Sequence, residues 1–150
     1  MSEEKVKTLK LGHSEHTIQN WILDCLGTQL HEAKRDKNGA YRKQPMNVYV
    51  HPDNHSVWYR NNTGAMMSVS GTWVKYGLGT GGADIIGVVN GRAVALEVKA
   101  DSGRQTGYQK VWQSHWQGAG GIYVVVRSAR EAVQVVERLL AGANDNHNIA

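Results

Sequence analysis

Hydrophobic residues recur at helical spacing in three parts of the chain. Residues 15–26 follow Ser14, a favourable N-cap residue. Their apolar face comprises Ile18, Trp21, Ile22, Cys25 and Leu26. A second helix is expected after Thr106, which has the form of a capping box with Gln109. Its expected apolar face comprises Tyr108, Val111, Trp112 and His115. Residues 128–131 repeat the capping pattern before the third helix, AREAVQVVERLL.

Five other runs favour β-strands: NVYV (47–50), SVWYR (56–60), ADIIGVV (83–89), RAVALEVKA (92–100) and IYVVV (122–126). The last is continuously apolar, which predicts the buried middle of a sheet. Residues 65–76 fit a strand with a glycine break, although their pattern is ambiguous. Residues 31–46 are polar and contain Asn38-Gly39 and Pro45, which predicts a loop.

The order of these elements predicts the fold class. The length of the chain suits one domain over residues 1–150. We expect its core to extend from about residue 14 to 140, with a flexible tail at 141–150. Strands mixed with helices predict an α/β fold in which helices flank a mixed central β-sheet.

A glycine-rich segment, GLGTGG, directly precedes the expected strand ADIIGVV and spells G-x-G-x-x-G at residues 77–82. A dinucleotide-binding loop needs a helix directly after the glycines, because the helix N-terminus binds the pyrophosphate. Here the β-branched run DIIGVV follows instead. The pattern therefore favours a flexible loop, or close approach of the backbone to a large ligand, over a nucleotide-cofactor site.

The dipeptide Asn90-Gly91 is the preferred centre of a tight type I′ hairpin turn. If it occupies that turn, Asp84 lies directly opposite Glu97, and their side chains share one face of the sheet. Lys99 is two residues beyond Glu97 and points to the same face. The sequence thus predicts two carboxylates and one ammonium group at one end of a hairpin.

Facing carboxylates repel each other, and burial makes the repulsion stronger. A divalent cation would offset this repulsion, and oxygen ligands of this kind suit Mg²⁺ or Mn²⁺. The alternative is that Asp84 caps a turn while Glu97 and Lys99 form an ordinary surface pair. The apolar neighbours favour a buried strand pair: Ile85, Ile86, Leu96 and Val98.

Composition excludes few classes of function. The chain has 17 Lys and Arg against 13 Asp and Glu, a net charge of +4, which permits a polyanionic partner without requiring one. Basic residues gather at 34–43, either as a solvated loop or as a contact for a polyanion. The single cysteine, Cys25, excludes an intrachain disulfide and a cysteine-rich zinc site. No long apolar run or signal-peptide core is present, so we expect a cytoplasmic protein that does not bind membranes.

The segment GGADIIGVVNGRAVALEVKADSGRQTGYQKVWQ, followed by GAGGIYVVV, resembles the virus-type replication-repair nuclease (VRR-NUC) domain of the PD-(D/E)xK nuclease superfamily, in its stand-alone, phage-like form. The resemblance extends over residues 14–140 and is most specific in this segment. It implies a restriction-endonuclease-like fold. Ala83 stands where the family often has proline, and we expect residues 38–57 to be an addition to the family pattern, with a role that is open.

The resemblance also implies roles for individual residues. Asp84 and Glu97 would be metal ligands, with the backbone carbonyl of Val98 as a third, for Mg²⁺ or Mn²⁺. Lys99 would be the catalytic lysine. Gln109 matches a helix glutamine near the active site, a role that competes with helix capping.

Three further residues are candidates for the site or for contacts with DNA. Glu15 matches a first-helix glutamate that approaches the metal directly or through water; alternatively it serves only the helix dipole. Arg60 lies in an R-N segment similar to one in the family and is a candidate phosphate contact, although a turn role for its neighbours is at least as well supported. Arg104 follows Lys99 closely and is a second candidate phosphate contact.

The function implied is metal-dependent endonucleolytic hydrolysis of DNA in the cytoplasm of a bacterial or phage-infected cell. Branched substrates such as Holliday junctions or flaps, and a homodimer, follow from the same resemblance. The alternative is a nucleic-acid-binding accessory module of the same fold that does not cut. Zinc binding by His51 and His55 is disfavoured because no third ligand is near, and Trp112 with Trp116 favours core packing over base stacking.

Overall fold

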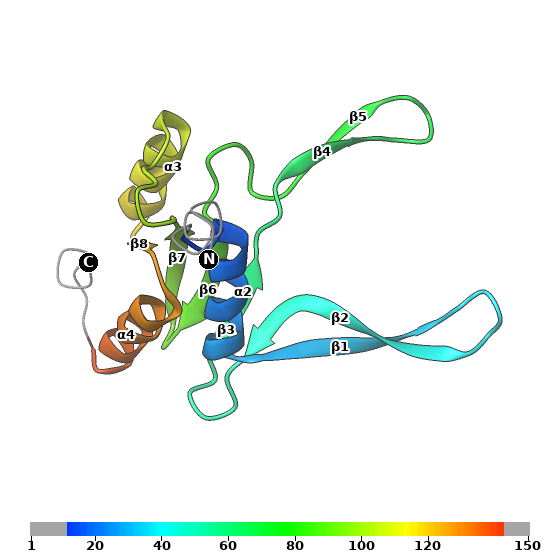
Figure 1. Cartoon of the computed structure of the whole chain (residues 1–150), viewed down its shortest axis with the longest axis horizontal. Coiled ribbons are helices and arrows are strands. Elements are labelled where there is room, and N and C mark those ends of the chain that lie inside the picture. The colour runs from blue at the N-terminus through cyan, green and yellow to red at the C-terminus, as the bar shows by residue number, and fades with distance from the viewer. Residues whose placement is uncertain (1–11, 143–150) are drawn as a thin grey trace, which may run out of the picture.

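The computed structural model describes residues 12–142, which form a mixed α/β fold (Figure 1). The helices are α2 (Glu15–Leu26), α3 (Gly107–Gly118) and α4 (Ala129–Leu140). The strands are β1 (Thr28–Arg35), β2 (Tyr41–Val50), β3 (Val57–Arg60), β4 (Gly64–Met67), β5 (Trp73–Tyr76), β6 (Ile85–Val89), β7 (Arg92–Val98) and β8 (Ile122–Val126). The predicted fold class, a mixed sheet flanked by helices, is confirmed.

Six strands form one sheet in the order β1-β2-β3-β6-β7-β8, and β4 pairs with β5 separately. All neighbours in the large sheet are antiparallel except β7 and β8, which are parallel. The parallel pair is possible because α3 provides the crossover between the two strands. The sheet therefore contains a tight hairpin, β6–β7, next to a crossover unit, and both contribute to the candidate site.

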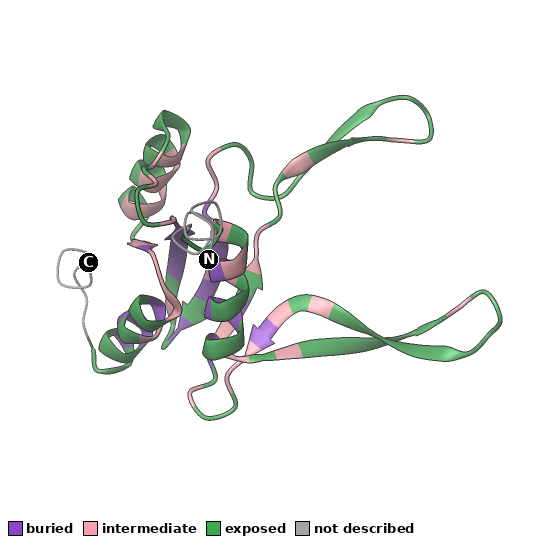
Figure 2. Cartoon of the chain, viewed as in Figure 1, coloured by how far each residue is buried: buried purple, intermediate pink, exposed green. Residues whose placement is uncertain are grey.

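The core lies on both faces of this sheet, and Figure 2 shows the buried residues gathered in its centre. Helices α2 and α4 cover one face, where alternate residues of β7 and β8 pack with the apolar residues of both helices. Helix α3 covers the other face through Trp112 and Trp116, which pack with Ala95 and Tyr123. Over β7 and β8 both faces of the sheet are covered by helix side chains, so a polar side chain there, such as that of Glu97, is removed from water.

All three helices begin at the predicted N-cap residue, whose hydroxyl accepts a backbone hydrogen bond. The Ser14 hydroxyl accepts a hydrogen bond from the Thr17 N–H, and Thr106 forms the complete capping box with Gln109. At α4 the Ser128 hydroxyl accepts from the Glu131 N–H, but the Glu131 carboxylate accepts from the N–H of Arg127 rather than of Ser128. The capping box predicted there is therefore only half formed.

The turn at Asn90-Gly91 has the positive φ angles, 50° and 74°, of a type I′ hairpin. Val89 pairs with Arg92, and the register continues to Ile85 opposite Leu96. Gly87 is required in this strand, because an added Cβ would clash with the buried indole of Trp58 on β3. The predicted hairpin register is confirmed.

The loop predicted at residues 31–46 is wrong. Residues 28–50 form a long antiparallel hairpin, which we call the β1–β2 arm, and Asn38-Gly39 lies at its tip. Pro45 is accommodated because it stands opposite His31, next to a bulge, on a ribbon that pairs on one side only. The ambiguous segment at 65–76 contributes a second hairpin, β4–β5, rather than one interrupted strand.

Two smaller expectations are also wrong. Strand β8 lies at an edge of the sheet rather than in its middle, and it is buried because helices cover both of its faces. The predicted apolar face of α3 is rotated: Tyr108, Val111 and His115 are exposed, whereas Trp112 and Trp116 face the sheet.

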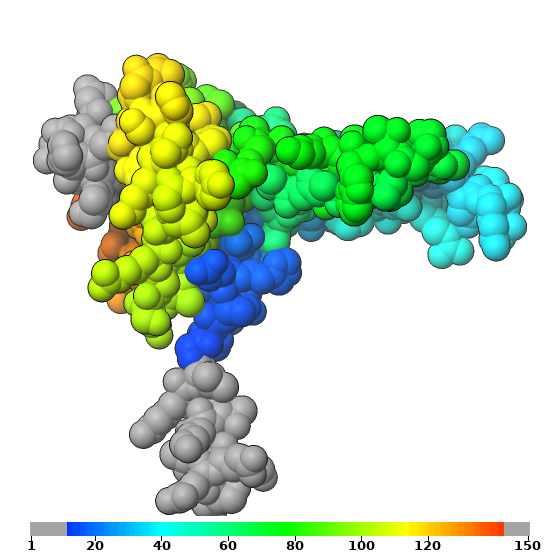
Figure 3. Space-filling model, turned by 90° about the horizontal axis from the view of Figure 1, so that it is seen from above, coloured from blue at the N-terminus to red at the C-terminus, as the bar shows by residue number. Residues whose placement is uncertain are grey.

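Figure 3 shows the β1–β2 arm and the β4–β5 hairpin extending from the body in the same direction. None of the helices formed by residues 12–142 has the length and hydrophobicity that a membrane crossing needs. Most of the tail predicted at 141–150 lies outside the described residues.

Candidate active site

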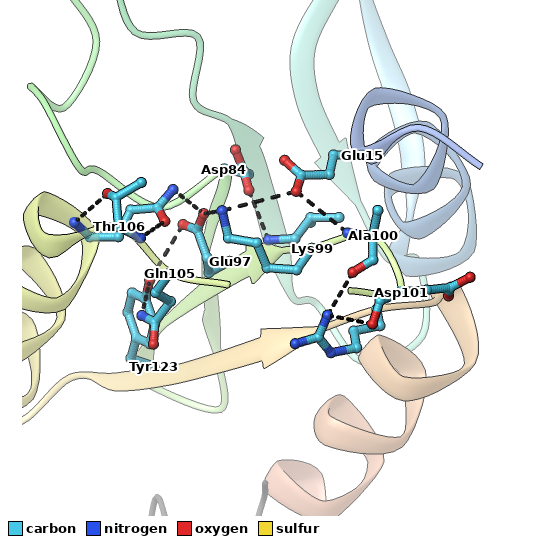
Figure 4. Close-up of polar contacts among 12 residues, drawn as sticks. Glu15, Asp84, Glu97, Lys99, Ala100, Asp101, Gln105, Thr106 and Tyr123 are labelled. Atoms are coloured by element: carbon cyan, nitrogen blue, oxygen red, sulfur yellow. Dashed lines mark hydrogen bonds and ion pairs between the residues drawn. The ribbon is translucent and has the colours of Figure 1, made fainter. Parts of the chain in front are cut away.

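The candidate site lies at the end of β6 and β7 that is remote from the hairpin turn (Figure 4). Asp84 precedes β6, and its Oδ2 accepts a hydrogen bond of 2.8 Å from the backbone N–H of Val98. Glu97 lies on the α3 side of β7, since alternation places it on the same face as Ala95. The two predicted carboxylates are therefore brought together, as the hairpin register requires.

Lys99 joins this pair from the residue just beyond β7. Its Nζ lies 3.5 Å from Oε1 of Glu97. Glu97 is 1% exposed and Lys99 is 6% exposed, so both charges are almost entirely removed from water. The backbone N–H of Lys99 donates to the Val126 carbonyl of β8, which fixes the backbone that carries the ammonium.

Glu15 reaches the same end of the sheet from the first turn of α2. Its Oε1 is 4.0 Å from Nζ of Lys99 and accepts a hydrogen bond of 3.4 Å from the Ala100 N–H. Its side chain is 41% exposed, so it lies on the solvent side of the ammonium. Gly103 borders it closely: an added Cβ would lie 3.2 Å from the Glu15 carboxylate.

Gln109 has both of the roles that competed in the sequence. Its Oε1 accepts from the Thr106 N–H at 2.8 Å, which completes the capping box. Its Nε2 donates to Oε1 of Glu97 at 2.6 Å. The helix cap thus locks the rotamer of a side chain that in turn orients a site carboxylate.

Two residues that the sequence did not indicate complete the surroundings of Glu97. The Tyr123 hydroxyl on β8 donates to Oε2 of Glu97 over 3.4 Å. Gln105 donates from Nε2 to the same hydroxyl at 3.1 Å and to Oε1 of Gln113 at 2.9 Å. The sequence held one signal for the role of Tyr123: its hydroxyl is the only polar side-chain atom in the strand IYVVV.

Asn61 positions the strand that carries Asp84, a role beyond the turn formation expected for it. Its N–H donates to the Asp84 carbonyl at 2.8 Å, and its Nδ2 donates to the Ala83 carbonyl at 2.9 Å. Its Oδ1 accepts from the Leu78 N–H at 3.1 Å, so one side chain holds both ends of the glycine-rich loop. That loop leads into strand β6 and not into a helix, as the sequence predicted.

Arg60 lies beside the site, because β3 pairs it with Ile85, the residue after Asp84. The Arg60 guanidinium is hydrogen-bonded to Asn20 and to His16 of α2, so it fastens β3 to the helix. Arg104 is exposed in the loop between β7 and α3.

The tryptophan pair packs on the sheet as predicted, and His51 has a structural role in its turn. His51 accepts from the N–H groups of Asp53 and Asn54, which stabilises a turn. Trp112 and Trp116 stack at 4.9 Å between ring centroids, and Trp116 donates from Nε1 to the Ile122 carbonyl.

Burial makes the carboxylates of this site hard to ionise. Burial, followed by repulsion from Asp84, raises the pKa of Glu97 from its ordinary 4.5 to about 7. Burial likewise raises the pKa of Asp84, although the hydrogen bond from Val98 opposes this shift. Burial and the nearby Glu97 charge raise the pKa of the Tyr123 hydroxyl, which therefore remains a hydrogen-bond donor.

These observations fit a divalent cation. Among the described residues no buried side-chain nitrogen or oxygen lacks a hydrogen-bond partner, yet Lys99 alone offsets the charges of two facing carboxylates. Within residues 12–142 no group of three or more Asp, Glu, His or Cys side chains is arranged to hold a metal ion. Mg²⁺ commonly takes only one or two carboxylates and completes its shell with other oxygens, so the pair Asp84 and Glu97 suits it.

Without metal, the protein is expected to lose stability as the pH rises from about 4.5 to about 7. In this window the folded state keeps a proton on Glu97 that the unfolded state has released, so the free energy of unfolding falls with pH. The full loss, up to about 3 kcal/mol, is present above that window. Because Mg²⁺ competes with this proton, it should raise the Tm more at pH about 8 than at pH about 5.

Thermal unfolding with and without Mg²⁺, across this pH range, measures the effect. The control is Glu97→Gln, which has no proton to release and should show a flatter curve. Parallel curves for the two proteins would contradict the assignment of the proton to Glu97.

A comparison with family models found no match to the chain, and comparisons with curated proteins and with solved structures found none either.

Proposed function

We propose that the protein is a nuclease that hydrolyses DNA phosphodiester bonds with a bound Mg²⁺ or Mn²⁺ ion. The observation that carries this proposal is the meeting of Asp84, Glu97 and Lys99 at one sheet end, with Glu97 and Lys99 almost fully buried. Two acids and an ammonium in this arrangement suit chemistry in which negative charge develops on a phosphate.

Asp84 and Glu97, together with the Val98 carbonyl, are the groups that would hold the cation. Bound there, it would supply Lewis acidity toward a phosphate oxygen and lower the pKa of a water ligand. The protein's own contribution is to keep the two carboxylates fixed. Gln109 and Tyr123 hold the Glu97 carboxylate, and Asn61 holds the backbone of Asp84.

Lys99 provides the positive charge that belongs to the protein itself. Its ammonium lies between the carboxylates of Glu97 and Glu15, so its position is defined on two sides. From there it can donate a hydrogen bond to a phosphate oxygen as water attacks phosphorus and the sugar oxygen leaves. Glu15, which is partly exposed beside it, is suited to orient that water.

The resemblance to stand-alone VRR-NUC domains supports a branched DNA substrate, such as a Holliday junction or a flap, and a homodimer. A twofold dimer would present two such sites to two DNA strands. The mixed sheet flanked by helices is compatible with the restriction-endonuclease-like arrangement that this resemblance implies.

The test is a cleavage panel of labelled single-stranded, duplex, flap and four-way-junction DNA, each with Mg²⁺, Mn²⁺ or EDTA. The wild type should produce cut strands with either metal and none with EDTA, and Asp84→Ala should produce none. Asp24→Ala, which removes an exposed carboxylate on α2, is the matched control and should cut normally. DNA binding with no cleavage on any substrate would favour the alternative, a nucleic-acid-binding accessory module.

A further inference from the structure

We infer that one face of the β1–β2 arm binds the phosphate backbone of duplex DNA, away from the point of cleavage. The identification of DNA as the partner rests on the proposed function. The inference itself is carried by the charges on the arm, which the strand register sorts onto two different faces.

The arm is a preformed projection rather than a flexible loop. Residues 41–47 of β2 precede the part of this strand that pairs with β3, and at about 3.4 Å per residue they carry the arm roughly 24 Å beyond the sheet. At the tip, the Asp36 carboxylate accepts hydrogen bonds from the N–H groups of Asn38 and Ala40, which closes the turn. Figure 2 shows the arm exposed over nearly its whole length.

On one face of the arm the cations are neutralised. Lys34 and Arg42 lie opposite each other across the two strands, where like charges repel. Glu32 lies 3.3 Å from the Lys34 ammonium, and the Asp36 carboxylate accepts from the Arg42 guanidinium at 2.9 Å. This face, which we call the paired face, therefore has little net charge to offer a partner.

The opposite face carries cations without acids. Arg35 lies opposite Tyr41, and Lys43 lies opposite Ala33. The Arg35 guanidinium is 4.9 Å from the centroid of the Tyr41 ring, and Tyr41 is 67% exposed. Within residues 12–142 no carboxylate lies within ion-pair distance of Arg35 or Lys43. We call Arg35, Tyr41 and Lys43 the basic face.

This arrangement fits duplex DNA. Arg35 and Lys43 are diagonal neighbours, about 7–8 Å apart at the backbone, so both can contact phosphates of one strand. The exposed Tyr41 hydroxyl is a further donor to phosphate. A two-stranded β-ribbon fits the major groove of B-form DNA, whereas the deep, narrow major groove of duplex RNA does not admit it.

The position of the arm separates binding from chemistry. Its base continues from the C-terminal end of α2, whereas Glu15 and the candidate site lie at the N-terminal end of that helix. The basic face would thus hold duplex DNA that flanks the cleavage point. We expect substitutions there to change DNA affinity and its salt dependence.

The experiment measures binding of a labelled duplex of about 25 base pairs by fluorescence anisotropy in EDTA, over a range of salt concentrations. Arg35→Gln/Lys43→Gln should weaken binding roughly tenfold or more at about 0.1 M salt and reduce the slope of log affinity against log salt by about 1.8, which corresponds to two lost phosphate contacts. The matched control, Lys34→Gln/Arg42→Gln, removes the same charge from the paired face and should stay within about threefold of wild type. A duplex RNA of the same sequence should bind more weakly than the DNA.

Circular dichroism and Tm check that each variant is folded. If the double variant is less stable than wild type, Lys43→Gln alone decides, because Lys43 forms no ion pair within the described residues; it should reduce the salt slope by about 0.9. Any one of four results would overturn the inference. Both double variants could lose the same affinity, or the basic-face variant could bind as well as wild type. The wild type could fail to bind duplex DNA, or it could bind duplex RNA equally well.

Because the assay contains no metal, its result is independent of cleavage. DNA binding that depends on the arm, without any cleavage, would contradict only the proposed function. Cleavage without binding that depends on the arm would contradict only this inference.

Discussion

Replacing Glu97 with Gln is expected to reduce DNA cleavage on the order of 10³-fold while the protein stays folded. The substitution keeps the size of the side chain and leaves an oxygen that can accept the hydrogen bond from Gln109. It removes one of two facing carboxylates, and with it the negative charge that would attract a divalent cation. The measurement is a single-turnover cleavage rate with Mg²⁺, together with the Tm.

The same substitution is expected to stabilise the metal-free protein above pH about 7. Burial and repulsion from Asp84 oppose ionisation of Glu97, and a neutral amide avoids both costs. Glu137→Gln on α4 removes an exposed carboxylate and is the control, with no expected effect on cleavage. Activity within tenfold of wild type in a folded Glu97→Gln protein would rule out this carboxylate as an essential ligand.

Replacing Lys99 with Ala is expected to slow cleavage about 10²- to 10³-fold, which is the effect of removing one donor that stabilises developing charge. Its Nζ is 3.5 Å from Glu97 and 4.0 Å from Glu15, and within residues 12–142 no other Lys or Arg forms an ion pair with either acid, so no other cation is placed to substitute for it. The loss should appear in the rate at saturating DNA rather than only in affinity. Single-turnover rates at several DNA concentrations separate the two effects.

Stability provides a second readout for Lys99. The ammonium lowers the pKa of Glu97, so its removal should raise that pKa further and lower the Tm most at alkaline pH, where Glu97 must ionise without its partner. Lys99→Arg keeps the charge and should be less destabilising than Lys99→Ala. The control is Lys110→Ala on the exposed side of α3. Normal cleavage by folded Lys99→Ala would exclude the ammonium from the chemistry.

The centre of the site could be predicted because its geometry is local in sequence. Asn90-Gly91 determines the turn, the turn determines the register, and the register places Asp84 opposite Glu97. The cap formed by Thr106 and Gln109 was equally readable, because its two partners are three residues apart.

The contacts of Tyr123 and Asn61 could not be predicted in the same way. Tyr123 meets Glu97 only because β8 lies parallel to β7 after a helical crossover, and this pairing spans 26 residues. Asn61 meets Ala83 across 22 residues, at the two ends of a segment whose path periodicity does not determine. Such contacts depend on the assembled sheet rather than on any local pattern.

The β1–β2 arm was missed for a different physical reason. Periodicity reveals a strand only when one face is buried, and residues 30–45 of the arm expose both faces to water. The only local signal left in this segment was its turn-forming residues. Asp36 and Asn38-Gly39 are equally compatible with the tip of a hairpin and with an irregular loop. The packing face of α3 was predicted wrongly for a different reason. The two stacked indoles of Trp112 and Trp116 pack on the sheet in place of the smaller apolar residues of the helix.

The β1–β2 arm joins the rest of the protein only at its base, so its length can change without changing the rest of the fold. Because side chains alternate between faces along a strand, an insertion or deletion keeps Arg35 and Lys43 turned toward the same side only if each strand changes by an even number of residues. Within that rule, evolution can lengthen or shorten the projection, and so alter its reach along a nucleic acid, without disturbing the hairpin that carries Asp84 and Glu97.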